Sequence, residues 1–201
     1  AVDTALTNCA VALVACAQDT DGGAASSDGA EGEPSPAERS SETRARIDVR
    51  ATETVAMARG HAEALLPMVA RVMTAAGADF SSIDRIAVTV GPGSFTGLRV
   101  GISAARGLGL ASGKPVVGVT TLAALAAPLA AEEGLFPIIS AIDARHDHVY
   151  FQVTGGRGTI LIRPRAGTIA EAVAASRFRP CRLVGHPAAL LAENWPARTQ
   201  P

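Results

Sequence analysis

The glycine-rich run from Gly91 to Gly101 is the segment whose residue types best suit binding chemistry. It reads Gly-Pro-Gly-Ser-Phe-Thr-Gly-Leu-Arg-Val-Gly and lies between an expected strand and an expected helix. Glycines permit a tight turn, and the free N–H groups of a helix N-terminus can bind an anion. The Gly-Lys-Ser/Thr ending of a Walker A loop is missing. Gly93, Ser94 and Thr96 are candidate nucleotide or anion contacts. The structural alternative is a turn in which Ser94 or Thr96 caps the helix.

Two aspartates each end an expected strand of a hairpin. Asp3 closes the first strand and Asp143 closes a later one. Paired aspartates in such positions suit magnesium–nucleotide chemistry, which makes Asp3 a further candidate nucleotide contact. A phosphate-binding loop, however, usually has glycine beside the aspartate so that the backbone can approach the phosphate. Thr4 and Ala144 stand there instead, so a nucleotide site and a structural role both stay open.

The run His146-Asp147-His148 looks like a fragment of a metal site. It falls in an expected turn, and no third ligand stands at a clear spacing. We therefore expect no metal site. No Ser-His-Asp or Cys-His arrangement can be argued from spacing either, so no catalytic residue is assigned.

The elements that must position these residues follow an α/β order. A hairpin leads into helices and strands, and a second hairpin starts the same pattern again, which predicts two similar α/β lobes. We expect strands at 1–3, 10–16, 47–57, 83–90, 115–119, 136–142, 149–153 and 182–184, and helices at 61–77, 96–111, 120–132, 167–175 and 187–193.

One segment of the first hairpin has a different composition. From Ala17 to Arg46 the chain has no Val, Ile, Leu, Met or aromatic residue, and it carries seven acidic and three basic residues. Such a segment cannot bury enough apolar surface to offset its ordering entropy. We expect a disordered surface insertion at 17–46, with a binding tail as the alternative. The domain prediction is an N-terminal lobe at 1–135 and a smaller, incomplete second lobe at 136–201.

The composition excludes several classes of protein. The chain has 201 residues, 48% of them hydrophobic and only 3% aromatic, and a net charge of −1. It is therefore not wholly disordered, and it has no global basic field for nucleic acid. No apolar run is long enough to span a bilayer. Three scattered cysteines do not make a disulfide framework and suit a reduced, cytoplasmic setting. Both ends of the chain look trimmed.

Two expected helices carry more apolar surface than one sheet requires. The apolar arc of residues 65–76 covers about half of the helical wheel, although a stripe of about 100° suffices against one sheet. From Gly97 to Ala111 the charges are Arg99 and Arg106, and several glycines suggest close approach of another backbone. A sandwiched core position and a protein interface both fit these patterns.

Several motifs, in order along the chain, closely resemble the signature of the TsaB (YeaZ) family. They are Ala1-Val2-Asp3-Thr4, Arg59 to Glu63 with Leu65 to Pro67, Gly91 to Gly101, Lys114 to Leu122 and Ala141 to Arg145. The Gly91 run is the most specific of them, and together they span most of the chain. The resemblance implies a two-lobed α/β fold of the actin/Hsp70/sugar-kinase (ASKHA) type with RNase H-like lobes, in the glycoprotease-like (M22) superfamily. Two departures are the 17–46 insertion and the absence of the C-terminal stretch that normally follows.

The resemblance also implies a function. Family members are bacterial subunits of the machinery that forms N6-threonylcarbamoyladenosine at position 37 of ANN-decoding tRNAs. They dimerise with the catalytic paralogue TsaD, which the ATPase TsaE joins. We therefore expect a cytoplasmic, non-catalytic scaffold or activator subunit without a cofactor of its own. ATP and metal belong to the partner subunits, tRNA is reached through the complex, and a homodimer in isolation is a further state.

In the resembling family, the two helices rich in apolar surface pair with those of TsaD. The partner interface expected by this resemblance comprises Leu65, Met68, Val69, Val72, Met73, Arg99, Val100, Ser103, Ala104 and Gly107.

The resemblance also places a lost metal site. The metal-binding histidines of the catalytic relative align with Thr121 and Leu125 of this chain. Leucine has no lone pair to give, and threonine is rarely a ligand for such metals. The rival functions are an ATPase or sugar kinase of the same fold and a metallopeptidase-like glycoprotease. The surroundings of Asp3 and Asp143 argue against the first, and Thr121 and Leu125 argue against the second.

Overall fold

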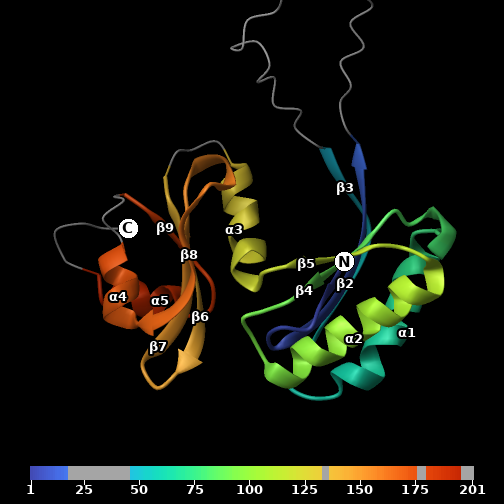
Figure 1. Ribbon diagram of the computed structural model, residues 1–201, viewed down its shortest axis with the longest axis horizontal. Helices are drawn as coiled ribbons and strands as arrows, with labels where there is room; N and C mark the ends of the chain where they lie inside the picture. The colour runs from blue at the N-terminus through green and yellow to red at the C-terminus, as the bar shows by residue number, and fades with distance from the viewer. Residues whose placement is uncertain (18–45, 133–135, 176–179, 196–201) are drawn as a thin grey trace, which may run out of the picture.

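The computed structural model describes residues 1–17, 46–132, 136–175 and 180–195. Within these residues the chain forms two β-sheets with helices packed against them (Figure 1). The first sheet, sheet A, has the strand order β3-β2-β1-β4-β5. Its strands are β1 (Val2–Asp3), β2 (Asn8–Ala17), β3 (Arg46–Ala56), β4 (Ile86–Thr89) and β5 (Val116–Val119).

Sheet A joins an antiparallel hairpin to a short parallel part. Strand β2 pairs antiparallel with both β1 and β3, whereas β1, β4 and β5 run parallel. The hairpin β2–β3 has a register shift between Leu13 and Val14. The carboxyl ends of the three parallel strands therefore lie at one edge of the sheet, where Asp3 is found.

Helices α1 (His61–Ala75) and α2 (Phe95–Ser112) lie side by side on one face of sheet A (Figure 1). Ser94 caps α2 by accepting a hydrogen bond from the N–H of Gly97, and Gly113 ends the helix at φ 67°. That positive φ suits glycine, which lacks a Cβ. The buried core beneath the two helices consists of Val2, Cys9, Val11, Leu65, Met68, Val69, Val72, Ile86, Val88 and Ala105.

The second sheet, sheet B, has the strand order β8-β7-β6-β9. Its strands are β6 (Ile138–Arg145), β7 (His148–Thr154), β8 (Ile160–Thr168) and β9 (Arg182–Val184). Strands β6, β7 and β8 are antiparallel neighbours, and β9 runs parallel to β6. Each sheet thus contains a hairpin followed by a parallel strand, as expected for two similar α/β lobes.

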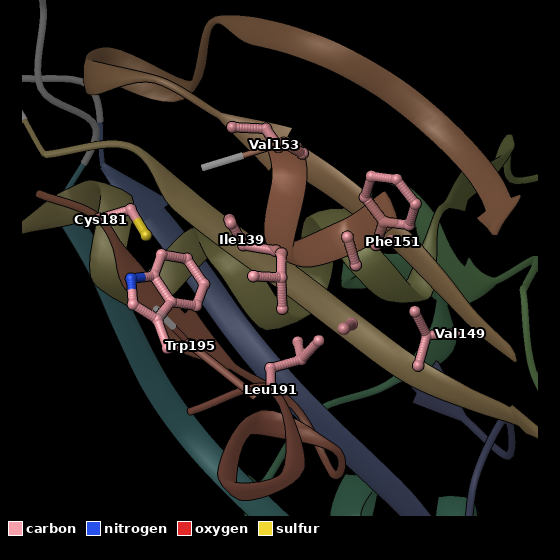
Figure 2. Close-up of a cluster of buried hydrophobic side chains, with 11 residues drawn as sticks. Ile139, Val149, Phe151, Val153, Cys181, Leu191 and Trp195 are labelled. Atoms are coloured by element: carbon pink, nitrogen blue, oxygen red, sulfur yellow. The ribbon is translucent and has the colours of Figure 1, made fainter. Parts of the chain in front are cut away.

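Helices cover both faces of sheet B. Helix α3 (Thr121–Ala131) contacts β6 and β7, while α4 (Ile169–Ala174) and α5 (Ala188–Glu193) pack on the other side (Figure 1). Figure 2 shows how the second core is assembled, with Leu191 and Trp195 turned toward the side chains of sheet B. The buried members of this cluster are Ile139, Ala141, Val149, Phe151, Val153, Ala172, Val173, Ala175, Cys181, Leu191 and Trp195.

The expected elements are largely confirmed, with one omission. Strand β8 occupies residues 160–168, where the sequence predicted no strand, and the helix expected from Gly167 begins only at Ile169. Pro164 lacks an N–H and argues against a central strand, but β8 lies at the sheet edge, where proline is tolerated.

Two features of the domain organisation, the insertion and the lobe boundary, stay predictions. Residues 18–45 of the expected insertion at 17–46 lie outside the described residues. The lobe boundary at 135 stays a prediction, although α3 precedes it and packs on sheet B.

Candidate functional site

A groove between α1 and α2 is the surface nearest to the expected partner interface. It has a volume of about 360 Å³ and is lined by Ala62, Leu65, Leu66, Arg99, Val100, Ser103 and Ala104. Leu66 is 52% exposed and lies outside the buried stripe of α1. We call this surface the α1/α2 groove.

Four of the ten expected interface residues do not form a free surface. Leu65, Met68, Val69 and Val72 are all less than 9% exposed, because they are the stripe of α1 that packs on sheet A. Met73 is half-buried against the same core. Their side chains therefore belong to the chain's own core, and Leu65 also lines the α1/α2 groove; a role for them in partner contacts stays a prediction. Most of the apolar arc of α1 packs into the chain's own core.

The remaining five expected residues lie on α2, four of them in the α1/α2 groove. Val100 and Ala104 are half-buried in its wall, and Arg99 and Ser103 are exposed. Gly107 is exposed but lines a different groove, between α2 and β5. The structure therefore brings together a smaller set than the sequence predicted.

Sequence reasoning missed three exposed residues on this face of the two helices. Ala62 and Leu66 line the groove. Phe95 is 68% exposed, and the guanidinium carbon of Arg99 lies 3.7 Å from the centre of its ring, a cation–π contact. A usable signal existed for Leu66, since it falls out of phase with the buried positions 65, 68, 69 and 72.

The glycines of α2 were expected to admit a partner helix, and most of them do not. A Cβ on Gly97 would overlap the carbonyl oxygen of Thr4, and a Cβ on Gly101 would overlap the Thr4 hydroxyl. Gly109 is similarly closed by Val116. Only at Gly107, among these four, would a Cβ meet open space. The close approach that the glycines allow is therefore to strands and loops of the same chain.

The candidate anion-binding loop is tied to the loop that follows β1. The N–H of Ser94 donates to the carbonyl of Ala5 at 2.6 Å, and a Cβ on Gly93 would overlap the same oxygen. The Ser94 hydroxyl caps α2 at 3.2 Å from the N–H of Gly97, whereas Thr96 is exposed. These contacts account for Gly93 and Ser94 as structural residues. Anion binding by the loop stays a prediction.

Asp3 is also held within this network. Its Oδ1 accepts hydrogen bonds from the N–H of Ala5 at 2.9 Å and from the Thr89 hydroxyl at 2.8 Å. Thr89 ends β4, so the pair links the carboxyl ends of two neighbouring parallel strands. An aspartate so engaged stabilises the strand ends, and its negative charge would oppose an anion bound close by.

Asp143 and the neighbouring histidines form a tight turn. Asp143 Oδ1 accepts from the N–H of Arg145 at 2.7 Å, and the ring of His148 lies 2.6 Å from the carbonyl of His146 through Nδ1. The φ angles of His146 and Asp147 are 53° and 59°, which suits the two-residue turn between β6 and β7. In the described residues no group of three or more His, Cys, Asp or Glu side chains could hold a metal.

Thr121 and Leu125, where the resemblance places the metal ligands of the catalytic relative, lie on α3. The N–H of Thr121 donates to the carbonyl of Gly91 at 2.9 Å, so the helix start is tied to the glycine-rich loop. The Thr121 side chain is buried and Leu125 is half-buried.

None of the helices in the described part of the chain is both long and apolar enough to cross a membrane.

Comparisons with known proteins agree with these features. A family model described as "TsaD: tRNA N6-adenosine threonylcarbamoyltransferase" matches residues 54–189. The TsaB protein of Escherichia coli, described as a tRNA threonylcarbamoyladenosine biosynthesis protein, is 41% identical over 93 residues, which are 46% of this chain and 40% of the relative. A tRNA N6-adenosine threonylcarbamoyltransferase of Erythrobacter litoralis is 34% identical over 137 residues, covering 64% of this chain and 37% of the relative. The chain thus spans about 40% of the length of these curated relatives.

A solved structure shares the fold. The Pseudomonas aeruginosa protein described as similar to peptidase YEAZ superimposes with a TM-score of 0.58 at 31% identity, covering 83% of this chain and 63% of that one. The α/β fold expected from the sequence is therefore confirmed as that of the YeaZ structures.

Proposed function

The chain belongs to the TsaD family and within it is of the TsaB/YeaZ type, and from this premise we propose that it acts in the biosynthesis of N6-threonylcarbamoyladenosine in tRNA. In this proposal it is a cytoplasmic, non-catalytic subunit that pairs with a TsaD-like catalytic paralogue. A TsaE-like ATPase joins the pair, and tRNA is bound through the complex. ATP and metal are held by the partner subunits, and the chain alone forms a homodimer when the paralogue is absent.

The α1/α2 groove is the observation that carries this proposal. Its rim holds Leu66, Arg99 and Ser103, all exposed, beside the exposed ring of Phe95. Isolated exposed apolar side chains are ordinary, but neighbouring ones around a groove are typical of protein interfaces. Two helices side by side form half of a four-helix packing surface. A homologous chain with the same two helices can supply the other half.

The non-catalytic role is supported by the chemistry of the strand ends. Asp3 is engaged by Ala5 and Thr89, and the glycine-rich loop is closed against the chain's own backbone. Thr121 has a buried hydroxyl at the position where the resemblance implies a metal-binding histidine in the paralogue. Asp3 and the glycine-rich loop hold the strand ends of sheet A together, and neither is placed as a free general acid, base or metal ligand.

The test is complex formation with the TsaD-like paralogue encoded in the same genome. Leu66→Glu and Ser103→Glu each place a charge at an exposed position of the groove. We expect folded chains whose affinity for the paralogue falls by about a hundredfold, because a buried unpaired charge is strongly destabilising. Val69→Glu is unsuitable here, since Val69 lies in the core and its variant would unfold.

Thr74→Glu is the matched control, since Thr74 is an exposed α1 residue that does not line the groove. Its affinity should equal that of the unchanged protein, with calorimetry giving the affinity and circular dichroism the folded state. Unchanged binding by both groove variants would place the interface elsewhere. ATP or peptide turnover by the purified chain alone would contradict the non-catalytic role.

A further inference from the structure

A second groove lies between the C-terminal half of α2 and strand β5. It has a volume of about 570 Å³ and is lined by Arg106, Gly107, Gly109, Leu110, Lys114 and Val116. Leu110 is 89% exposed, the highest value among the large hydrophobic residues of the described chain. The two grooves have no lining residue in common, so this groove is distinct from the α1/α2 groove. We call it the α2/β5 groove.

Strand β5 offers an open backbone edge beside this groove. It is the last strand of sheet A, and within the described residues it pairs only with β4. The carbonyls of Pro115 and Val119 accept from the N–H groups of Ile86 and Val90, and so point toward β4. Because backbone groups alternate along a parallel ladder, those of Val116 and Gly118 point to the outer edge. Both residues are exposed.

The charge of the α2/β5 groove is one-sided. Arg106 and Lys114 are its charged residues, and no carboxylate lines it. No ion pair engages Arg106 in the described part of the chain, and Lys114 Nζ donates to the backbone carbonyl of Ser81 at 2.9 Å. Neither cation is therefore neutralised by a carboxylate side chain there. An acidic ligand would find two cations without a carboxylate partner in a groove that is also lined by Leu110 and Val116.

We propose that the α2/β5 groove binds an extended, acidic segment of a partner protein, which adds to the outer edge of β5 as a further strand. The backbone of the segment would pair with Val116 and Gly118. An aliphatic side chain would pack on Leu110 and Val116, and acidic side chains on the same face would meet Arg106 and Lys114. A peptide fits better than single-stranded RNA, because the groove has no aromatic side chain for stacking a base.

This surface goes beyond the proposed function, because it is a second binding site that the paralogue's helices would leave open. The two sites can therefore fail separately. A loss of peptide binding with intact paralogue binding would concern only the α2/β5 groove, and the reverse would concern only the α1/α2 groove.

The experiment uses a defined peptide and the full chain. The probe is an acetylated, amidated Thr-Glu-Thr-Leu-Thr-Glu-Thr peptide, which places leucine and both glutamates on one face of a strand. We expect saturable binding in a fluorescence anisotropy titration, together with slower hydrogen exchange at the amides of Val116 and Gly118. Arg106→Glu should weaken binding by about tenfold, because it reverses one charge pair. Leu110→Asp should abolish it.

Matched controls test whether the peptide binds in the α2/β5 groove and whether charge determines its binding. Leu66→Asp alters the α1/α2 groove and should leave peptide affinity unchanged. A peptide with lysine in place of glutamate should bind the Arg106→Glu variant better than it binds the unchanged chain. The proposal is overturned if the acidic peptide does not bind, or if its affinity ignores both Arg106→Glu and Leu110→Asp. Binding of an oligouridine instead, with the same dependence on Arg106, would replace the peptide by RNA.

Discussion

Helices α1 and α2 cover the same face of sheet A with opposite kinds of side chain. Helix α1 buries Leu65, Met68, Val69 and Val72, whereas α2 buries Gly97, Gly101, Ala105 and Gly109. Large side chains fill the space between α1 and the β2–β3 hairpin. The small residues of α2 let its backbone lie directly on Thr4 and Val116. Each helix therefore buries one face against sheet A, α1 through large side chains and α2 through close approach of its backbone.

This difference shows that the large apolar residues of α1 and the small residues of α2 attach their helices to sheet A in different ways. The Thr4 hydroxyl donates to the carbonyl of Gly97 at 2.7 Å, so α2 is hydrogen-bonded to the loop after β1 through its own backbone. In the described part of the chain, no hydrogen bond joins the backbone of α1 to sheet A, and the helix is held by contacts of its side chains. The glycine spacing in α2 therefore marks an intramolecular contact, and the outer residues of both helices remain exposed.

The largest expected effect is at the α2 contact. Gly97→Val should abolish cooperative folding, at a cost of about 3 kcal/mol or more, because its Cβ would overlap the Thr4 carbonyl oxygen. Thermal unfolding followed by circular dichroism measures this. A sharp melting transition near that of the unchanged chain would show that α2 can move off the sheet.

A smaller effect is expected in the packed stripe of α1. Leu65→Ala should lower the free energy of unfolding by about 2–5 kcal/mol, because Leu65 is 1% exposed. Its neighbour Leu66 is half exposed, and Leu66→Ala should change stability by no more than about 0.5 kcal/mol. Urea denaturation compares the two. Equal losses would mean that α1 is buried on both sides.

The outward glycine of α2 gives the next test. A Cβ at Gly107 would meet open space, so Gly107→Ala should stabilise the chain by about 0.5–1 kcal/mol through helix propensity. The measurement is again urea denaturation. Destabilisation would indicate that Gly107, like the inner glycines of α2, is in close contact with another part of the chain.

The smallest effect concerns the polar attachment of α1 to β3. Arg71 Nε and Nη2 donate to the Glu53 carboxylate at 3.0 and 2.6 Å, and these hydrogen bonds are the main reason that the pKa of Glu53 lies below its ordinary value of 4.5. A lowered folded-state pKa stabilises the fold above the ordinary value. This stabilisation is lost as the pH falls through that value toward the folded-state pKa.

The test compares stability at about pH 7 and about pH 3.5, on either side of the ordinary glutamate range. Glu53→Gln should reduce the acid loss of stability slightly, since Arg71 is exposed and Glu53 is only half-buried, so that solvent screens the pair. Arg71→Met is the matched variant and should reduce the acid loss to the same extent. A steeper acid loss in either variant would contradict the assignment.

Much of the fold could be predicted from local pattern. Apolar runs such as Ile86–Thr89 and capping signals such as Ser94 and Gly113 marked strands and helices within a few residues. Strand β8 was not predicted, because Pro164 and two exposed arginines break the apolar pattern that is typical of a strand. An edge strand tolerates such residues, since its outer side has no neighbouring strand. The expected partner interface lies on the two helices that form the α1/α2 groove, but four of its ten residues are buried in the chain's own core.

The sequence by itself determined the family and the order of most of the elements. These follow from residue types at fixed spacings, which are local and readable along the chain. Only the tertiary structure decided which apolar side of each helix is free. Val69 and Leu66 are both apolar residues of one helix, and the glycines of α2 all permit close approach. Whether a partner or the chain's own sheet occupies that space depends on where Thr4 and Val116 come to lie, and contacts between distant segments do not appear in the periodicity of either helix.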